Sequence, residues 1–185
     1  MARKIQQDVM HRTSFNPIIN DKSVTLIVGV APAENYIEQG QYYCNPNDCF
    51  WEAIGQFLNV PPNFPTTAYN TKLFLLKSHG IALWDIIHEC DRTGATNKDI
   101  VKVTSYNDIP DLLLKYPSIE NIIFNGKDAY TYFKRYILAK YPNNTNLKRF
   151  LKRNFVITLN TTARTEENRA KILADWHKKV APLFK

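Results

Sequence analysis

The stretch SVTLIVGV (residues 23–30) gives the strongest indication of the fold. It is a continuous run of β-branched and other apolar residues that reaches a glycine near its end, which is typical of a strand buried on both faces. Similar apolar runs occupy residues 81–87, 120–126 and 154–159. Because helical patterns separate these runs, the sequence predicts a three-layer αβα fold around a mostly parallel four-stranded sheet.

Helical patterns fill the intervals between these strands. We expect helices over residues 49–58, 68–79, 105–117, 127–141 and 165–180. Asn47 or Asp48 could cap the first of them. The length suits a single domain over residues 1–185, with residues 1–13 as a flexible or ancillary N-terminal segment.

Composition limits the class of protein. The net charge is +7, and the basic residues are concentrated after Gly126, which favours a polyanion partner such as DNA. A solvated basic surface would give the same charge. The three cysteines are an odd number without zinc spacing, so we expect a reduced, cytoplasmic protein without a metal or other cofactor. No apolar run is long enough to span a membrane.

In a parallel sheet, ligands bind beyond the carboxyl ends of the strands. Gly29, Val30, Ala31 and Pro32 form the loop after the first strand, and its glycine permits a tight turn or close approach to a ligand. These four residues could equally form an ordinary turn with no ligand.

The segment QYYCNPNDCFW (41–51) combines aromatic and polar residues in the same region. Tyr43 is a candidate for stacking on a nucleobase, whereas Phe50 and Trp51 are expected in the core. Asp48 could activate a water molecule, cap the following helix, or do both.

Polar residues also end the other strands. Asp85 follows a buried apolar run, where a carboxylate is costly unless it is paired or functional, and we interpret it as functional. Asn125 lies at a strand end that could form either a phosphate site or a turn. Thr161, Thr162 and Arg164 together suit a phosphate clamp, to which LKRFLKR (147–153) adds positive charge.

Taken in order, these motifs resemble the uracil-DNA glycosylase superfamily, and most closely its hypoxanthine DNA glycosylase branch. The motifs that carry the resemblance are SFNPI, VTLIVGVAP, QYYCNPNDCFW, GIALWDIIHECDR, IIFNGKDAY and VITLNTTART. The resemblance covers the chain from Ser14 to about Trp176. It implies the αβα glycosylase fold and an enzyme that removes a damaged base from DNA during base excision repair.

The resemblance also implies roles for individual residues. Asp48 falls where the hypoxanthine branch carries a catalytic asparagine, and Asn45 falls where it carries a histidine. Tyr43, Asp85, Asn125 and the loop 29–32 correspond to the base pocket. Thr161, Thr162 and Arg164 correspond to the DNA phosphate-binding loop.

We therefore expect a monomeric, monofunctional DNA glycosylase that acts on hypoxanthine or uracil in duplex or single-stranded DNA. No lysine in these motifs is placed to form a Schiff base. Two alternatives remain open because of the substitutions at Asn45, Asp48 and residues 160–164: a module that binds modified DNA without hydrolysis, and an N-glycosidase that acts on free nucleosides or nucleotides.

Overall fold

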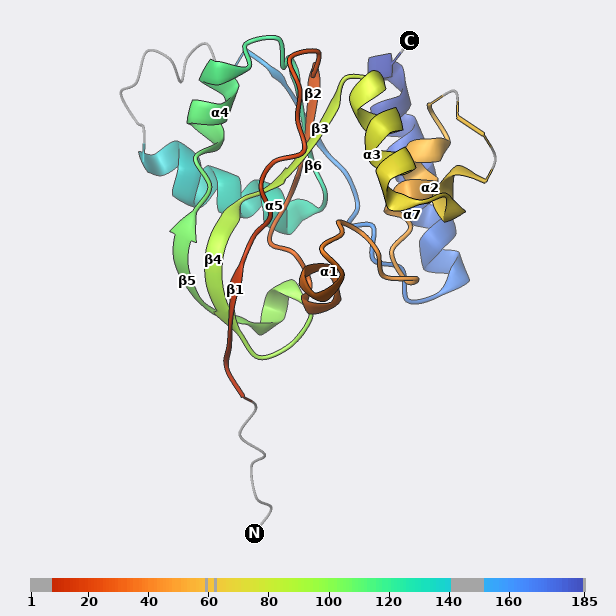
Figure 1. Ribbon diagram of the computed structural model, residues 1–185. Helices are drawn as coiled ribbons and strands as arrows, with labels where there is room; N and C mark the ends of the chain where they lie inside the picture. The colour runs from red at the N-terminus through yellow and green to blue at the C-terminus, as the bar shows by residue number, and fades with distance from the viewer. Residues whose placement is uncertain (1–7, 59, 62, 141–151, 185) are drawn as a thin grey trace.

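The computed structural model describes residues 8–58, 60–61, 63–140 and 152–184. At its centre lies a four-stranded parallel sheet in the order β3-β2-β6-β7 (Figure 1). The strands are β2 (Thr25–Gly29), β3 (Ile81–Asp85), β6 (Asn121–Phe124) and β7 (Asn154–Ile157). All four predicted strands are present, so the predicted αβα fold with a parallel sheet is confirmed.

Both faces of this sheet are covered, as continuous apolar strands require. Along β2, Ile27 packs into one core, while Leu26 and Val28 pack into the other, and all three side chains are fully buried. The first core lies under α2 (Phe50–Gly55), α3 (Tyr69–Ser78) and α7 (Glu166–Val180), which gather on one side of the sheet in Figure 1.

The second core lies under α4 (Ile109–Lys115) and α5 (Lys127–Tyr132) on the opposite side (Figure 1). The pattern over 127–141 predicted one helix, and α5 is continued by a π-helical turn (Phe133–Ile137) and a 3-10 turn (Leu138–Lys140). This irregular continuation still buries Phe133 and Ile137. The apolar spacing therefore located the buried face correctly without specifying the helix type.

A second sheet was not predicted. It is antiparallel in the order β1-β4-β5 and consists of β1 (Met10–Thr13), β4 (Ile87–Arg92) and β5 (Ile100–Tyr106). Of the segment 1–13, which was expected to be flexible or ancillary, Met10–Thr13 form β1 and pair with β4. These strands mix polar or charged residues with apolar ones and are only partly buried, so they lack the continuous apolar run that revealed the parallel sheet.

The remaining elements are short. Helix α1 (Glu34–Gln39) was not predicted, and 3-10 turns occupy Phe64–Thr66, Asn97–Asp99 and Ala181–Phe184. Of the basic segment 147–153, residues 147–151 lie outside the described part of the chain. No helix within the described ranges has the length and apolar character needed to cross a membrane.

Candidate active site

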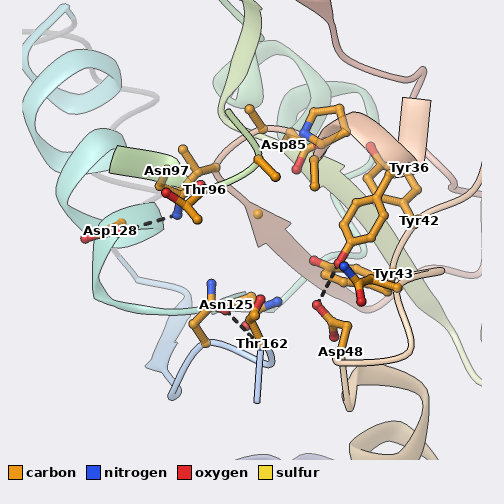
Figure 2. Close-up of a pocket in the computed structure, with 18 of the residues that line it drawn as sticks. Tyr36, Tyr42, Tyr43, Asp48, Asp85, Thr96, Asn97, Asn125, Asp128 and Thr162 are labelled. Atoms are coloured by element: carbon orange, nitrogen blue, oxygen red, sulfur yellow. Dashed lines mark hydrogen bonds between the residues drawn. The ribbon is translucent and has the colours of Figure 1, made fainter. Parts of the chain in front are cut away.

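A pocket of about 460 Å³ lies at the carboxyl ends of the parallel strands. The ends of β2 and β3 and the residue after β6 line it, and α1 and the turn after β4 contribute further walls (Figure 2). The residues predicted from the sequence that line this pocket are Gly29, Val30, Ala31, Pro32, Tyr43, Asn45, Asp48, Asp85, Asn125, Thr162 and Arg164. The fold thus gathers segments separated by more than 100 residues around one cavity.

Asp48 is half-buried, and both of its carboxylate oxygens accept hydrogen bonds. Oδ2 accepts from the Tyr36 hydroxyl at 2.7 Å, and Oδ1 accepts from the Phe50 backbone N–H at 2.9 Å (Figure 2). The N-cap residue of α2 is Cys49, and its side chain makes no capping hydrogen bond. Asp48, one residue before it, accepts the hydrogen bond from the first helical N–H instead. Burial raises the pKa of the Asp48 carboxyl, while hydrogen bonds from Thr161, Tyr36 and Phe50 lower it in part.

The loop that carries Asp48 is fastened to the loop after β7. Asp48 and Thr162 form an isolated antiparallel bridge. The Cys49 N–H donates to the Thr161 carbonyl at 2.9 Å, and the Ala163 N–H donates to the Asn47 carbonyl at 2.7 Å. The predicted catalytic residue and the predicted phosphate loop are therefore joined by backbone hydrogen bonds.

Asn45 organises the turn that leads to Asp48. Its side-chain oxygen accepts the Asn47 N–H at 2.9 Å, and its backbone carbonyl accepts the Asp48 N–H at 2.8 Å. These contacts are those of an Asx turn, in which a side chain substitutes for a backbone acceptor. Asn45 also lines the pocket, so it can contact a ligand while holding Asp48 in place.

Asp85 lies deep in the pocket and is only 3% exposed. Burial raises the pKa of its carboxyl to about 7, and the nearby Tyr42 hydroxyl lowers it in part. Within the described residues, neither Asp85 Oδ2 nor the Tyr42 hydroxyl oxygen has a partner at hydrogen-bond geometry. Two buried polar atoms are thus available to a ligand at the end of β3.

Gly29 provides the space for this carboxylate. It pairs with Asp85 across β2 and β3, and a Cβ at position 29 would lie 2.5 Å from Asp85 Oδ1. A side chain at position 29 would force the buried Asp85 carboxylate to move, so glycine leaves the room that this carboxylate occupies. Gly29 is the last residue of β2, so this glycine serves the packing of Asp85.

Tyr43 lines the pocket but is not a free stacking surface. Its ring stacks on Phe50 with 3.8 Å between centroids and 15° between planes, and the side chain is 8% exposed. Its backbone has a φ of 54°, which is uncommon for a residue with a side chain. Phe50 and Trp51 are buried in the core, as predicted. One face of Tyr43 is covered by Phe50, so a base can meet only its other face or its edge.

The loop after β7 differs from the prediction in one respect. Thr161 is fully buried, and its hydroxyl accepts a hydrogen bond from Asn125 Nδ2 at 2.9 Å. The Thr161 N–H donates to Asn125 Oδ1 at 3.0 Å. Thr161 thus shapes the loop and does not present its hydroxyl to DNA, whereas Thr162 and Arg164 are exposed at the pocket.

Comparisons with known proteins agree with this geometry. No protein-family model matches the chain. A hypoxanthine DNA glycosylase of Methanosarcina acetivorans is 32% identical over 123 residues, which cover 66% of this chain and 76% of that protein. The chain belongs to the hypoxanthine DNA glycosylase family. The hypoxanthine DNA glycosylase of Methanosarcina barkeri is 30% identical over 124 residues, with the same coverage of both chains.

A solved structure shares the fold of this hypoxanthine DNA glycosylase family member. It is the solution NMR structure of a protein from Methanosarcina acetivorans described as a candidate uracil DNA glycosylase. The TM-score is 0.67 at 24% identity, and the match covers 91% of this chain and 98% of that one. The resemblance to the hypoxanthine DNA glycosylases is thereby confirmed, and the solved structure confirms the predicted fold.

Several residues that line the pocket of this hypoxanthine DNA glycosylase family member were not predicted from the sequence. They comprise Tyr36 and Tyr42, the turn residues 95–98, and Asp128. Thr96, Asn97 and Asp128 lie across the pocket from the three tyrosines (Figure 2), and Asn97 Nδ2 donates to Asp128 Oδ2 at 3.4 Å. In the described residues, no group of His, Cys, Asp or Glu side chains is arranged to hold a metal ion.

Proposed function

We propose that this protein is a DNA N-glycosylase that hydrolyses the bond between deoxyribose and a deaminated purine, hypoxanthine being the first candidate. The observation that carries the proposal is the half-buried Asp48 carboxylate, which is oriented at the pocket by Tyr36 and by the start of α2. Membership of the hypoxanthine DNA glycosylase family and the basic charge of the chain support it.

The reaction requires the target nucleotide to leave the base stack and enter the pocket. Asp48 in its ionised form orients a water molecule toward the anomeric carbon C1′. The water oxygen bonds to C1′ as the C1′–N9 bond breaks, the bonding electrons leave with the base, and Asp48 takes the proton from water. The negative charge of Asp48 also stabilises the oxocarbenium-like sugar in the transition state.

The other predicted residues have supporting roles in this proposal. Tyr43 and the loop 29–32 enclose the base, and Asp85 contacts its polar edge from the end of β3. Thr162 and Arg164 hold a phosphate beside the pocket. Arg169, whose positive charge lowers the pKa of Asp48, also offsets the unfavourable charge of Asp48 near the DNA backbone.

The test is a panel of oligonucleotides that contain hypoxanthine, uracil or another damaged base, each in single-stranded and duplex form. We expect release of free base by the wild-type protein, and a loss of about 10²–10⁴-fold in Asp48→Ala. Asp48→Asn restores the family-like residue but removes the negative charge and the proton acceptor, so release is expected to fall. A gain of hypoxanthine release in Asp48→Asn would instead show that the site has diverged in specificity. Absence of release from every oligonucleotide by folded protein would refute the proposal.

The same assay separates the two alternatives. DNA binding without turnover, unchanged in Asp48→Ala, would indicate a binding module, which the substitutions at Asn45 and Asp48 motivate. Release from free nucleosides but not from oligonucleotides would indicate a nucleoside hydrolase.

We also propose that the enzyme is monofunctional and leaves the DNA strand intact. Lys98 lines the pocket on the wall opposite the tyrosines, a placement that the motifs did not indicate. The abasic product should stay uncut until alkali is added, and borohydride should trap no protein–DNA adduct. A borohydride-dependent adduct that is lost in Lys98→Met would overturn this part of the proposal.

A further inference from the structure

The wall of the pocket opposite the tyrosines is formed by a turn of the second sheet. The turn joins β4 to β5, and residues 95–98 of it line the pocket. Ala95, Thr96 and Lys98 are exposed, and the 3-10 turn Asn97–Asp99 buries no side chain. Apolar packing therefore does not hold this wall in place.

Polar contacts hold the turn instead, and the largest set comes from Arg92 at the end of β4. Its guanidinium donates to the Pro32 carbonyl through Nη1 at 2.7 Å, to the Gly94 carbonyl through Nε at 2.6 Å, and to the Thr96 carbonyl through Nη2 at 2.8 Å. The side chain is only 1% exposed. Arg92 thus joins the turn between β4 and β5 to the loop 29–32 at the end of β2, and both segments line the pocket.

The turn has its own internal brace. The Thr96 N–H and hydroxyl donate to Asp99 Oδ2 at 2.8 and 2.7 Å, and these bonds lower the pKa of the Asp99 carboxyl. This brace fixes the shape of the turn but does not connect it to the loop 29–32. The hydrogen bond from the Arg92 guanidinium to the Pro32 carbonyl makes that connection.

We propose that Arg92 is a positioning residue of the base pocket, which fixes the turn 94–98 against the loop 29–32 before the substrate enters. This inference rests on the proposed function. A planar guanidinium can reach three divergent carbonyl oxygens at once, whereas a lysine ammonium is a compact charge that cannot span them. Arg92→Lys therefore keeps the charge and removes the connection between the two walls.

The experiment compares Arg92→Lys with wild type and with Arg135→Lys, a matched change at an exposed arginine outside the pocket lining. Amide hydrogen exchange should become faster in residues 30–33 and 94–98 of Arg92→Lys, with the parallel sheet unchanged. Single-turnover release of the base should fall by about 10–100-fold, because misplacement by about 1 Å has a cost of this size. Affinity for undamaged DNA should stay within about twofold.

The outcomes separate positioning from general stabilisation. A lower melting temperature with unchanged release at lower temperature would overturn the proposal, as would unchanged exchange in both segments. In Arg92→Ala, added methylguanidinium should restore part of the release rate, whereas methylammonium at equal ionic strength should not. If wild-type protein releases no base at all, the proposed function fails, and the exchange measurement alone decides whether Arg92 fixes the two segments.

Discussion

The hydroxyl of Tyr36 donates a 2.7 Å hydrogen bond to Asp48 Oδ2, which joins α1 to the loop before α2 across the pocket wall. This bond favours the ionised carboxylate and therefore lowers the pKa of Asp48. The proposed reaction needs that ionised form, so Tyr36 is expected to extend activity toward lower pH.

Replacing Tyr36 by phenylalanine tests this relationship. Loss of the donor raises the pKa of Asp48, so the acidic limb of the pH–rate profile should move to higher pH. The rate on the alkaline side of that limb should change by no more than about tenfold, since Asp48 is ionised there in both proteins. Tyr130→Phe, which removes a hydroxyl outside the pocket lining, is the control and should leave the profile unchanged. A profile for Tyr36→Phe that overlays the wild type would contradict the role of this bond.

The buried carboxyl of Asp85 predicts a pH-dependent stability. Its pKa is about 7 in the folded protein and about 3.9 in an unfolded chain, so the folded state holds the proton more tightly between these values. The free energy of unfolding contributed by this group therefore falls as pH rises from about 4 to 7, by up to about 4 kcal/mol. Asp85→Asn has no such proton to lose.

Urea denaturation at several pH values measures this effect. The stability of Asp85→Asn relative to wild type should increase from pH 4 to pH 7 and then level off. A constant difference across that range would show that Asp85 titrates normally. Base release should also change in this variant, because an amide presents a different hydrogen-bonding edge to the base.

Gly29 and Asp85 should be coupled in stability. A Cβ at position 29 would lie 2.5 Å from Asp85 Oδ1, so Gly29→Ala is expected to destabilise the protein by about 1–3 kcal/mol. Shortening the opposing side chain in Asp85→Ala removes the clash, and the double variant should be more stable than the sum of the single changes predicts. Additive effects in a denaturant-based double-mutant cycle would contradict this close contact.

Arg164 provides a test of the phosphate site. It is exposed at the pocket, and Arg164→Ala should weaken DNA binding about equally for all sequences. The slope of log affinity against log salt concentration should decrease in magnitude by about 0.9. Lys22→Ala removes a charge before β2, at the opposite end of the sheet, and should leave the slope unchanged. An unchanged slope in Arg164→Ala would remove this residue from the DNA interface.

The sequence predicted the parallel sheet because its strands are buried on both faces and appear as uninterrupted apolar runs, as in Leu26, Ile27 and Val28. Because ligands bind beyond the carboxyl ends of parallel strands, the sequence then indicated one pocket for Asp85, which ends β3, and for the long loop segment after β2 that carries Asp48. The family resemblance added the roles of these residues, which periodicity alone could not supply.

Other parts of the site depend on contacts that leave no local pattern. Tyr36 belongs to a six-residue helix that the sequence did not predict. The wall at Thr96 comes from a partly exposed antiparallel sheet, whose strands mix polar with apolar residues and so lack a continuous apolar run. Thr161 was expected to face DNA, but its contact with Asn125 turns the hydroxyl inward, and spacing in the sequence contains no information on that orientation.

Backbone hydrogen bonds between residues 47–49 and 161–163 connect the segment that carries Asp48 to the loop that is proposed to bind phosphate. Because an isolated bridge and two backbone hydrogen bonds join the two segments, we expect a displacement of the loop after β7 to move the Asp48 carboxylate as well. A DNA strand whose phosphate binds this loop would at the same time orient the Asp48 carboxylate toward the sugar. We therefore expect DNA binding at this loop to be needed for correct positioning of Asp48. A free nucleoside, which makes no phosphate contact with the loop, should be hydrolysed far more slowly than the same nucleoside within a DNA strand.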